Sequence, residues 1–230
     1  MAKKQYFFIV DTETTEKDNV ADFAGVIVDR KGKIYNQIAV LVDGHYGKDK
    51  LFHDRNSSEE IWTLKGLEKR NNIYKDMLNN GQRMISSVAG INKWISQAKL
   101  NYPDLIFTAY NSKFDLGKMR NTGIDAEFKN QFCMWYSAVN EVQGNKAYIQ
   151  HCIDRKWFTE KLNARTNAEA MAEFVAGGEL PPEPHTALED IIEYELLIFK
   201  WLMSKGSWRK LDQTGYNWRK WQISLTCQPK

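Results

Sequence analysis

The sequence predicts an α/β protein in which a mixed β-sheet is flanked by helices. Short β-prone apolar segments alternate with longer segments whose apolar residues recur at helical spacing. A hairpin pattern precedes this alternation, and that order is typical of a mixed sheet covered by helices. The chain has 230 residues, of which 43% are hydrophobic, so it is long enough for one large domain with a substantial core.

The N-terminal half is expected to supply the first strands and two helices. Residues 5–10 are an apolar run typical of a strand buried on both faces. Residues 22–29 and 33–42 are β-rich and flank Arg-Lys-Gly-Lys, so we expect them to pair as a hairpin. Residues 59–78 and 84–99 carry apolar side chains at helical spacing, which predicts a helix over each.

The C-terminal half continues the alternation. Residues 105–110 predict a second buried strand, followed by a helix over 112–121 and a further strand over 131–138. Residues 166–176 predict a helix that ends at Gly-Gly, and three prolines then exclude helix over the next residues. Residues 187–204 are the strongest helical segment of the chain.

Composition and charge limit the classes of protein to which this chain can belong. A mean hydropathy of -0.56 and the absence of a long apolar run argue against a membrane span. Asp11 ends the N-terminal apolar run too early for a signal peptide. The three cysteines lack metal-binding spacing, so we expect reduced thiols in a cytoplasmic protein. The net charge of +3 permits an anionic partner without requiring one.

Residues 1–204 are expected to form the folded domain, with residues 205–230 as a tail packed on or next to it. Basic and aromatic residues are interleaved in this tail, as in Tyr216-Asn-Trp-Arg-Lys-Trp. Such a segment suits single-stranded nucleic acid, because cations contact phosphates and rings stack on bases. Packing of the tryptophans on the domain is an equally good interpretation.

The candidate functional residues are carboxylates spread over most of the chain. Asp11 and Glu13 lie two apart near the end of the first strand, and an extended chain places both on one face. Asp115 follows the strand predicted over 105–110. Ligands of such sheets collect beyond the carboxyl ends of the strands, so we expect these carboxylates to meet at one edge. Clustered carboxylates repel one another unless a cation neutralises them, which makes them candidates for hard divalent metal ions.

These first motifs also have interpretations without a functional site. Asp11 and Glu13 are acceptable as polar residues that close a strand. Ser112-Lys-Phe-Asp115 fits a capping box. In such a box the Ser112 side chain caps the helix, and the Asp115 side chain, at the third helical position, accepts a hydrogen bond from the Ser112 backbone amide.

A histidine and an aspartate follow before the last helix. Thr186-Ala-Leu-Glu189 fits a second capping box, which makes Glu189 a capping residue and not a metal ligand. His185 and Asp190 then lie against each other at the helix start, where an apolar pair usually packs. A surface His–Asp pair of little energetic value is the alternative.

The order and context of these motifs resemble the DEDDh family of 3′→5′ exonucleases, which share the ribonuclease H-like fold. The matching segments are Asp11-Thr-Glu13, Asn111-Ser-Lys-Phe-Asp115 and His185-Thr-Ala-Leu-Glu-Asp190. The resemblance covers residues 6 to about 200. It implies a ribonuclease H-like mixed central sheet flanked by helices.

The resemblance also implies a role for each matching residue. Two Mg²⁺ or Mn²⁺ ions would be held by four carboxylates, namely Asp11, Glu13, Asp115 and Asp190. His185 would be the general base that deprotonates the attacking water. Substrate contacts would come from neighbouring residues, namely Thr12, Thr14, Asn111 and Phe114.

The activity expected from the resemblance is release of nucleoside 5′-monophosphates from the 3′ ends of single-stranded nucleic acid, with DNA slightly favoured. An exoribonuclease that trims RNA ends or short oligonucleotides is the alternative enzyme. An inactive family member that binds nucleic acid or a protein is the alternative outside enzymes. Two kinds of protein partner remain as alternatives, a second copy of the chain in a homodimer and a polymerase or accessory protein. Residues 140–165 are either an insertion that grips substrate or a dimer contact.

Overall fold

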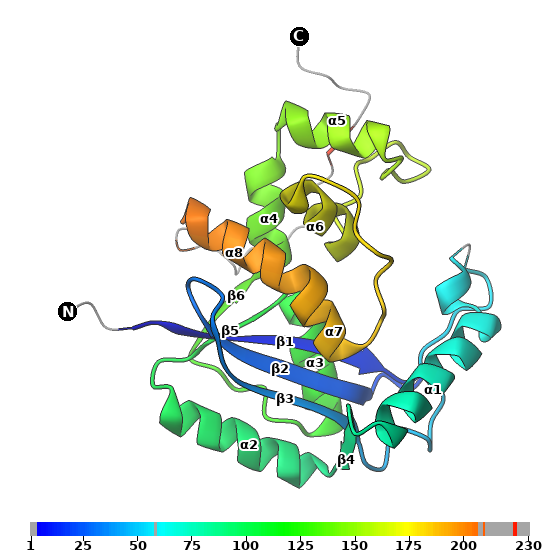
Figure 1. The fold of residues 1–230 in the computed structure, drawn as a ribbon, viewed down its shortest axis with the longest axis vertical. Helices are drawn as coiled ribbons and strands as arrows, with labels where there is room; N and C mark the ends of the chain where they lie inside the picture. The colour runs from blue at the N-terminus through cyan, green and yellow to red at the C-terminus, as the bar shows by residue number, and fades with distance from the viewer. Residues whose placement is uncertain (1–3, 58, 207–208, 210–222, 225–230) are drawn as a thin grey trace.

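In the computed structural model, residues 4–57, 59–206, 209 and 223–224 are described. They form an α/β structure with one six-stranded sheet and helices on both of its faces (Figure 1). None of the helices in this part of the chain has the length and apolar character that crossing a membrane requires.

The elements follow one another in a regular order. The strands are β1 (Tyr6–Thr14), β2 (Val20–Asp29), β3 (Ile34–Val42), β4 (Met84–Ser86), β5 (Ile106–Ala109) and β6 (Asn130–Cys133). The α-helices are α1 (Leu64–Asn79), α2 (Val88–Asn101), α3 (Ser112–Thr122), α4 (Met134–Val142), α5 (Lys146–Asp154), α6 (Ala168–Ala176), α7 (Ala187–Asp190) and α8 (Leu196–Lys205). A 3₁₀ turn, η1 (Glu60–Trp62), precedes α1, and a π-helical turn, η2 (Ile191–Glu195), joins α7 to α8.

The direction of the strands determines which chain segments meet. The sheet order is β4-β3-β2-β1-β5-β6, with β2 antiparallel to both β1 and β3. The strand β5 is parallel to β1, β6 is parallel to β5, and β4 is parallel to β3. The carboxyl ends of β1, β3, β4, β5 and β6 therefore lie at one edge of the sheet, together with the start of β2.

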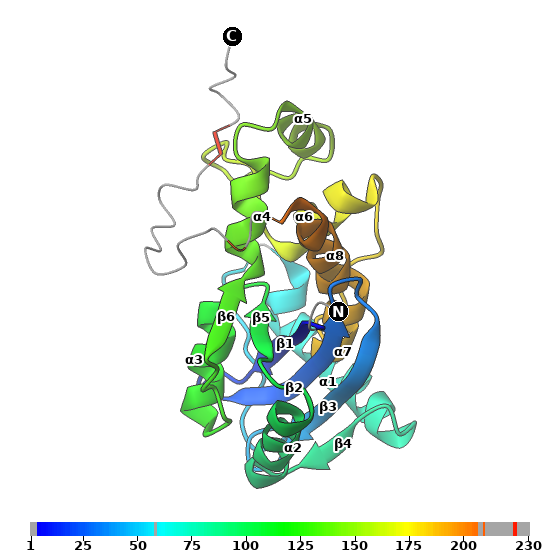
Figure 2. The same cartoon turned by 90° about the vertical axis from the view of Figure 1, so that its left-hand side faces the viewer.

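Alternating residues of β1 divide the core into two layers. Phe7 and Ile9 are buried on the face covered by α4, α6 and α8, whereas Phe8 and Val10 are buried against α2 and α3. Figures 1 and 2 both show α2 on one side of the sheet and α6 and α8 on the other. A strand covered on both faces has no polar side, which is why its start is a continuous apolar run.

The predicted hairpin and the predicted helices over 112–121, 166–176 and 187–204 are confirmed, with boundaries shifted by a few residues. The first strand is longer than predicted, because residues beyond the apolar run stay paired with β2 as far as Thr14. Asp11 and Glu13 therefore lie inside the strand and not after it.

Two predicted elements were assigned the wrong type in part. The strand predicted over 131–138 ends at Cys133, and α4 begins at the next residue. Its residues Met134 and Ala138 are four apart, and both are buried in the core. The helix predicted over 84–99 begins at Val88, because the preceding residues form the short edge strand β4.

The basic and aromatic residues of the predicted tail lie almost entirely outside the described residues. Ile223 and Ser224 are described, and they lie against the domain. The amide of Ala164 donates to the carbonyl of Ile223 at 2.8 Å, and Asn163 pairs with Ser224 in a short bridge. The Ile223 side chain is buried in the same core layer as Met171.

Candidate functional site

The first two predicted carboxylates lie on β1 and face the last helix. Asp11 and Glu13 have the same parity as Phe7 and Ile9, so they point toward the face covered by α7 and η2. Thr12 points the other way, toward α3. These positions place the β1 carboxylates between the two helical layers, at the edge where the strands end.

Asp115 is connected to β1 by a buried hydrogen bond. The Thr12 hydroxyl donates to Asp115 Oδ1 at 2.8 Å, and both side chains are buried. The capping box predicted at Ser112 is wrong, because Asn111 is the N-cap of α3 and its side chain makes no capping bond among the described residues. Asp115 is therefore fixed by β1 and not by its own helix.

His185, Glu13 and Asp190 come together at the start of α7. One side-chain nitrogen of His185 and one carboxylate oxygen from each of Glu13 and Asp190 all lie within 4.8 Å of one another. The predicted contact between His185 and Asp190 is thus confirmed, and a residue from the first strand joins it. This group of three has the composition of a metal site.

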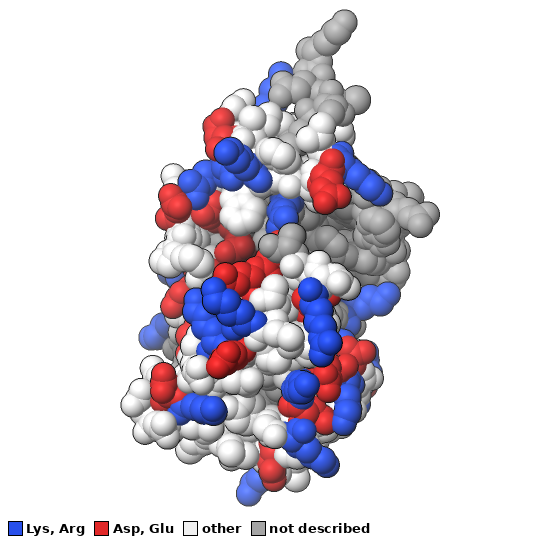
Figure 3. Space-filling model, turned by 90° about the vertical axis from the view of Figure 1, so that its right-hand side faces the viewer, with Lys and Arg blue, Asp and Glu red and all other residues white. Residues whose placement is uncertain are grey.

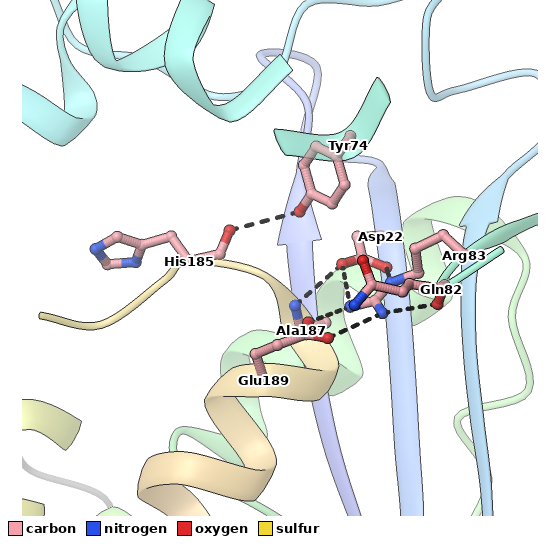
Figure 4. Close-up of polar contacts among 7 residues, drawn as sticks. All are labelled: Asp22, Tyr74, Gln82, Arg83, His185, Ala187 and Glu189. Atoms are coloured by element: carbon pink, nitrogen blue, oxygen red, sulfur yellow. Dashed lines mark hydrogen bonds and ion pairs between the residues drawn. The ribbon is translucent and has the colours of Figure 1, made fainter. Parts of the chain in front are cut away.

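The position of the His185 ring is determined by its backbone and by an aromatic neighbour. His185 has φ of 54°, a left-handed conformation that is uncommon for a residue with a side chain. The Tyr74 hydroxyl donates to the His185 carbonyl at 3.5 Å, and Figure 4 shows the imidazole on the opposite side of the backbone. The Trp62 ring lies 4.6 Å from the imidazole, centroid to centroid.

A buried ion network holds the segment that follows His185. Arg83 Nε donates to Asp22 Oδ1 at 3.1 Å, and Arg83 Nη1 donates to Glu189 Oε1 at 3.2 Å (Figure 4). Asp22 Oδ2 also accepts the Ala187 amide at 3.0 Å. Both the Arg83 and the Asp22 side chains are fully buried. The start of α7 is therefore attached to the start of β2 and to the residue before β4.

The capping role predicted for Glu189 is wrong. The Thr186 side chain, at the N-cap of α7, accepts no capping bond from a described residue, and the Glu189 carboxylate is bound to Arg83. That Glu189 is not a metal ligand stays a prediction, for which the ion pair with Arg83 now supplies the reason. Neither Asp22 nor Arg83 carries a sequence signal that would have revealed this network.

The carboxylates of the site destabilise one another in their charged forms. Burial, with a smaller contribution from Asp22, raises the pKa of Asp11 to about 7. Burial also raises the pKa values of Glu13, Asp115 and Asp190 well above their usual range, and the negative charge of Asp11 adds to each shift. All four predicted carboxylates therefore belong to one electrostatic cluster.

Two further carboxylates join this cluster, and sequence reasoning missed both. Glu195 in η2 is 3% exposed, and burial followed by the charges of Asp11 and Asp115 raises its pKa. Glu183 precedes His185, and burial together with Asp11 raises its pKa to about 8. Figure 3 shows acidic side chains gathered at the middle of one face, between groups of Lys and Arg.

The π-helical turn explains why Glu195 reaches the cluster. Positions five apart in an α-helix are about 140° apart around its axis, so Asp190 and Glu195 would point in different directions. A π-helical turn closes with i→i+5 hydrogen bonds and is wider. Asp190 and Glu195 are both buried, and the charges of Asp11 and Glu183 raise the pKa of each.

The residues present fit divalent cations. Asp190 Oδ1 and Glu195 Oε2 are buried and have no hydrogen-bond partner in the part of the chain that the structure describes. Arg70 lies near Glu13, with 4.0 Å between Nη1 and Oε2. One arginine does not balance six carboxylates, whereas Mg²⁺ and Mn²⁺ prefer oxygen ligands of this kind.

His185 is neutral at physiological pH. Burial, followed by the positive charge of Arg70, lowers its pKa to about 4. A neutral imidazole has one ring nitrogen that can accept a proton or bind a metal ion. The geometry around Glu13 and Asp190 is compatible with either role.

The residues predicted to contact substrate lie on β1 and at the start of α3. Thr12 and Thr14 are buried, and the Thr14 carbonyl accepts the Phe52 amide at 2.8 Å. Asn111 begins α3. Phe114 is 43% exposed, with Lys118 Nζ 4.8 Å from its ring centroid. Their contact with substrate stays a prediction.

Comparison with models of known protein families and with curated protein sequences gave no match for this chain.

The raised pKa values predict that the metal-free protein loses stability as the pH rises from 6.5 to 8.5. The folded state keeps protons on Asp11 up to about pH 7 and on Glu183 up to about pH 8, whereas the unfolded chain loses them near pH 4. His185 acts in the opposite direction, but only below pH 6.5. Thermal melting in chelator should give a lower Tm at pH 8.5 than at pH 6.5, and Mg²⁺ should reduce the difference. A Tm that rises with pH over this interval would contradict the cluster.

Proposed function

We propose that this protein is a metal-dependent 3′→5′ exonuclease that releases nucleoside 5′-monophosphates from single-stranded nucleic acid. The proposal includes membership of the DEDDh family and a ribonuclease H-like arrangement of the mixed sheet. DNA is slightly favoured as substrate, and an exoribonuclease acting on RNA ends or short oligonucleotides is the second candidate. Mg²⁺ or Mn²⁺ is the proposed cofactor.

One observation carries this proposal. Glu13 and Asp190 lie nearly the whole length of the chain apart, yet their oxygens meet a His185 nitrogen within 4.8 Å. Asp11 and Asp115 belong to the same electrostatic cluster of carboxylates. This is the set of residue types that metal-assisted phosphodiester hydrolysis requires.

Each residue has a distinct role in the proposed reaction. Two metal ions would be held by four carboxylates, namely Asp11, Glu13, Asp115 and Asp190. When bound, such ions neutralise the phosphate and stabilise the charge that develops during hydrolysis. His185 accepts a proton from water through its unprotonated ring nitrogen. Trp62 packs against this ring, with 4.6 Å between the ring centroids.

The inactive binding module is the weaker alternative. A protein that only binds nucleic acid gains nothing from several mutually repelling buried carboxylates, which oppose the approach of a phosphate backbone. The same carboxylates become attractive to the backbone once cations occupy them.

Degradation assays with end-labelled strands test the function. Single-stranded DNA and RNA labelled at the 5′ end are incubated with Mg²⁺, Mn²⁺ or chelator, and products are separated by gel and by chromatography. We expect progressive shortening from the 3′ end, with nucleoside 5′-monophosphates as products, in the presence of metal and none in chelator. Products that carry a 3′-phosphate, or no degradation of either strand with either metal, would overturn the proposal.

A further inference from the structure

A cavity of about 510 Å³ opens beside His185 and extends away from the carboxylate cluster. His185 and Glu183 line the end near the cluster, and Trp62 and Trp135 contribute aromatic surface. The opposite wall is formed by residues 163–167. Volumes between 300 and 1,000 Å³ are typical of sites for small organic ligands or parts of larger ones.

The wall at residues 163–167 is held in place from behind. The Tyr148 hydroxyl donates to the Arg165 carbonyl at 2.6 Å, and the Tyr110 hydroxyl donates to the Thr166 carbonyl. The Trp135 indole donates to the Thr166 hydroxyl at 2.9 Å. A wall fixed in this way can present polar side chains in a constant arrangement.

Two amide side chains lie on this wall. Asn167 Oδ1 is buried and has no partner among the described residues. Asn163 also lines the cavity. An amide side chain offers both a donor and an acceptor, and such groups recognise the edges of nucleobases.

The charges around the cavity disfavour an anion inside it. Arg165 Nη1 lies 2.8 Å from Glu59 Oε1, so the one arginine among the described residues of the lining is already paired. Glu169 remains in the lining, and its carboxylate would repel a phosphate group. The part of a ligand that enters must therefore be uncharged, planar and able to form hydrogen bonds.

We propose that this cavity binds the base of the substrate's terminal nucleotide, with Asn167 and Asn163 hydrogen-bonded to the base edge. The sugar and phosphate then extend past His185 toward the carboxylates and their cations. A base that is paired with a second strand cannot enter, because its partner would meet the wall. The inference rests on the proposed function, and it assigns substrate binding to the wall at residues 163–167.

Binding of nucleotides and of base-free sugar phosphates tests this inference without any cleavage. Calorimetric titrations of the full chain with Mg²⁺ compare AMP with ribose 5-phosphate, and dAMP with 2-deoxyribose 5-phosphate. A base bound in the cavity should strengthen binding at least about tenfold for one of these pairs. Asn167→Leu should weaken binding of that nucleotide about three- to tenfold and leave binding of its base-free sugar phosphate unchanged.

Two variants complete the design. Asn163→Leu should act in the same direction as Asn167→Leu, and Asn101→Leu, at the exposed end of α2 on the other face of the sheet, should have no effect. Equal affinity for a nucleotide and its base-free analogue in both pairs, or no binding at all, would overturn the inference. Retention of the full base preference in Asn167→Leu and Asn163→Leu would do the same. Because none of these ligands contains a phosphodiester bond between nucleotides, failure here is distinct from absence of exonuclease activity.

Discussion

Replacing Asp190 with asparagine should abolish metal-dependent degradation and at the same time raise the melting temperature of the metal-free protein. Asp190 is buried, one of its oxygens has no partner among the described residues, and Asp11, Glu183 and Glu13 all repel its charge. Asparagine has the same shape and no charge. The variant therefore loses a proposed metal ligand, and it also loses the electrostatic repulsion that the Asp190 carboxylate creates.

The two effects are measured separately. Loss of a ligand that positions a catalytic metal should lower the degradation rate by at least about a hundredfold, since such an ion contributes several kcal/mol to transition-state stabilisation. In chelator, each kcal/mol of relieved repulsion should raise the Tm by about 2–4 °C. Mg²⁺ should stabilise the wild-type protein and leave the Asp190→Asn variant almost unchanged.

Glu193→Gln is the matched control for this substitution. Glu193 lies on the same helical segment but is exposed, so the same loss of charge should leave both rate and Tm unchanged. A fully active Asp190→Asn variant would remove Asp190 from the proposed metal site. A lower Tm in chelator would show that its carboxylate is satisfied by a contact other than a cation.

Replacing Arg83 with methionine should destabilise the protein strongly. Arg83 is fully buried and neutralises Asp22, which is also fully buried, and Glu189, which is partly exposed. Removal of one partner from a buried ion network leaves a charge without compensation, and this typically costs about 3–5 kcal/mol. Urea denaturation followed by far-UV circular dichroism would measure the loss as a lower midpoint.

The same substitution should move His185, the proposed general base. Asp22 accepts a hydrogen bond from the Ala187 amide, two residues after His185. When Arg83 no longer holds the Asp22 carboxylate, we expect the start of α7 to be held less firmly. The remaining folded protein should degrade nucleic acid more slowly at saturating Mg²⁺. Arg120→Met is the control, because Arg120 forms an exposed pair with Glu127 and its loss should change stability by less than about 1 kcal/mol. Equal midpoints for the two variants would contradict the structural role of Arg83.

Some features of the site follow from local rules and could be predicted. Asp11 and Glu13 share a face because side chains alternate along any strand. His185 and Asp190 meet because the residue before an N-cap packs against the fourth residue of the helix. The prediction that carboxylates gather where parallel strands end rests on the sheet type, which the order of apolar segments indicates. These rules act within a few residues or within one sheet, so they can be read from the sequence.

Other features depend on contacts between distant segments. The spacing of Asp115 from Ser112 fits a local capping box. In the structure Asp115 is instead bound to Thr12, because α3 packs against β1. Glu189 fits the same local pattern and is instead bound to Arg83, from a segment that carries no recognisable motif. Hydrogen-bonding capacity alone does not select among several partners, and the tertiary fold makes that selection.

The sequence by itself determined an α/β fold. It also determined that four carboxylates and a histidine are placed to converge at one edge of the sheet. The tertiary structure alone decided that Glu183 and Glu195 join them. For Glu195 the reason is a π-helical turn, which changes which residues of the last helix share a side. It also decided that a cavity lies between Trp62 and Asn167, which are separated by more than a hundred residues. Periodicity describes one element at a time, whereas a cavity exists only between elements that have already packed.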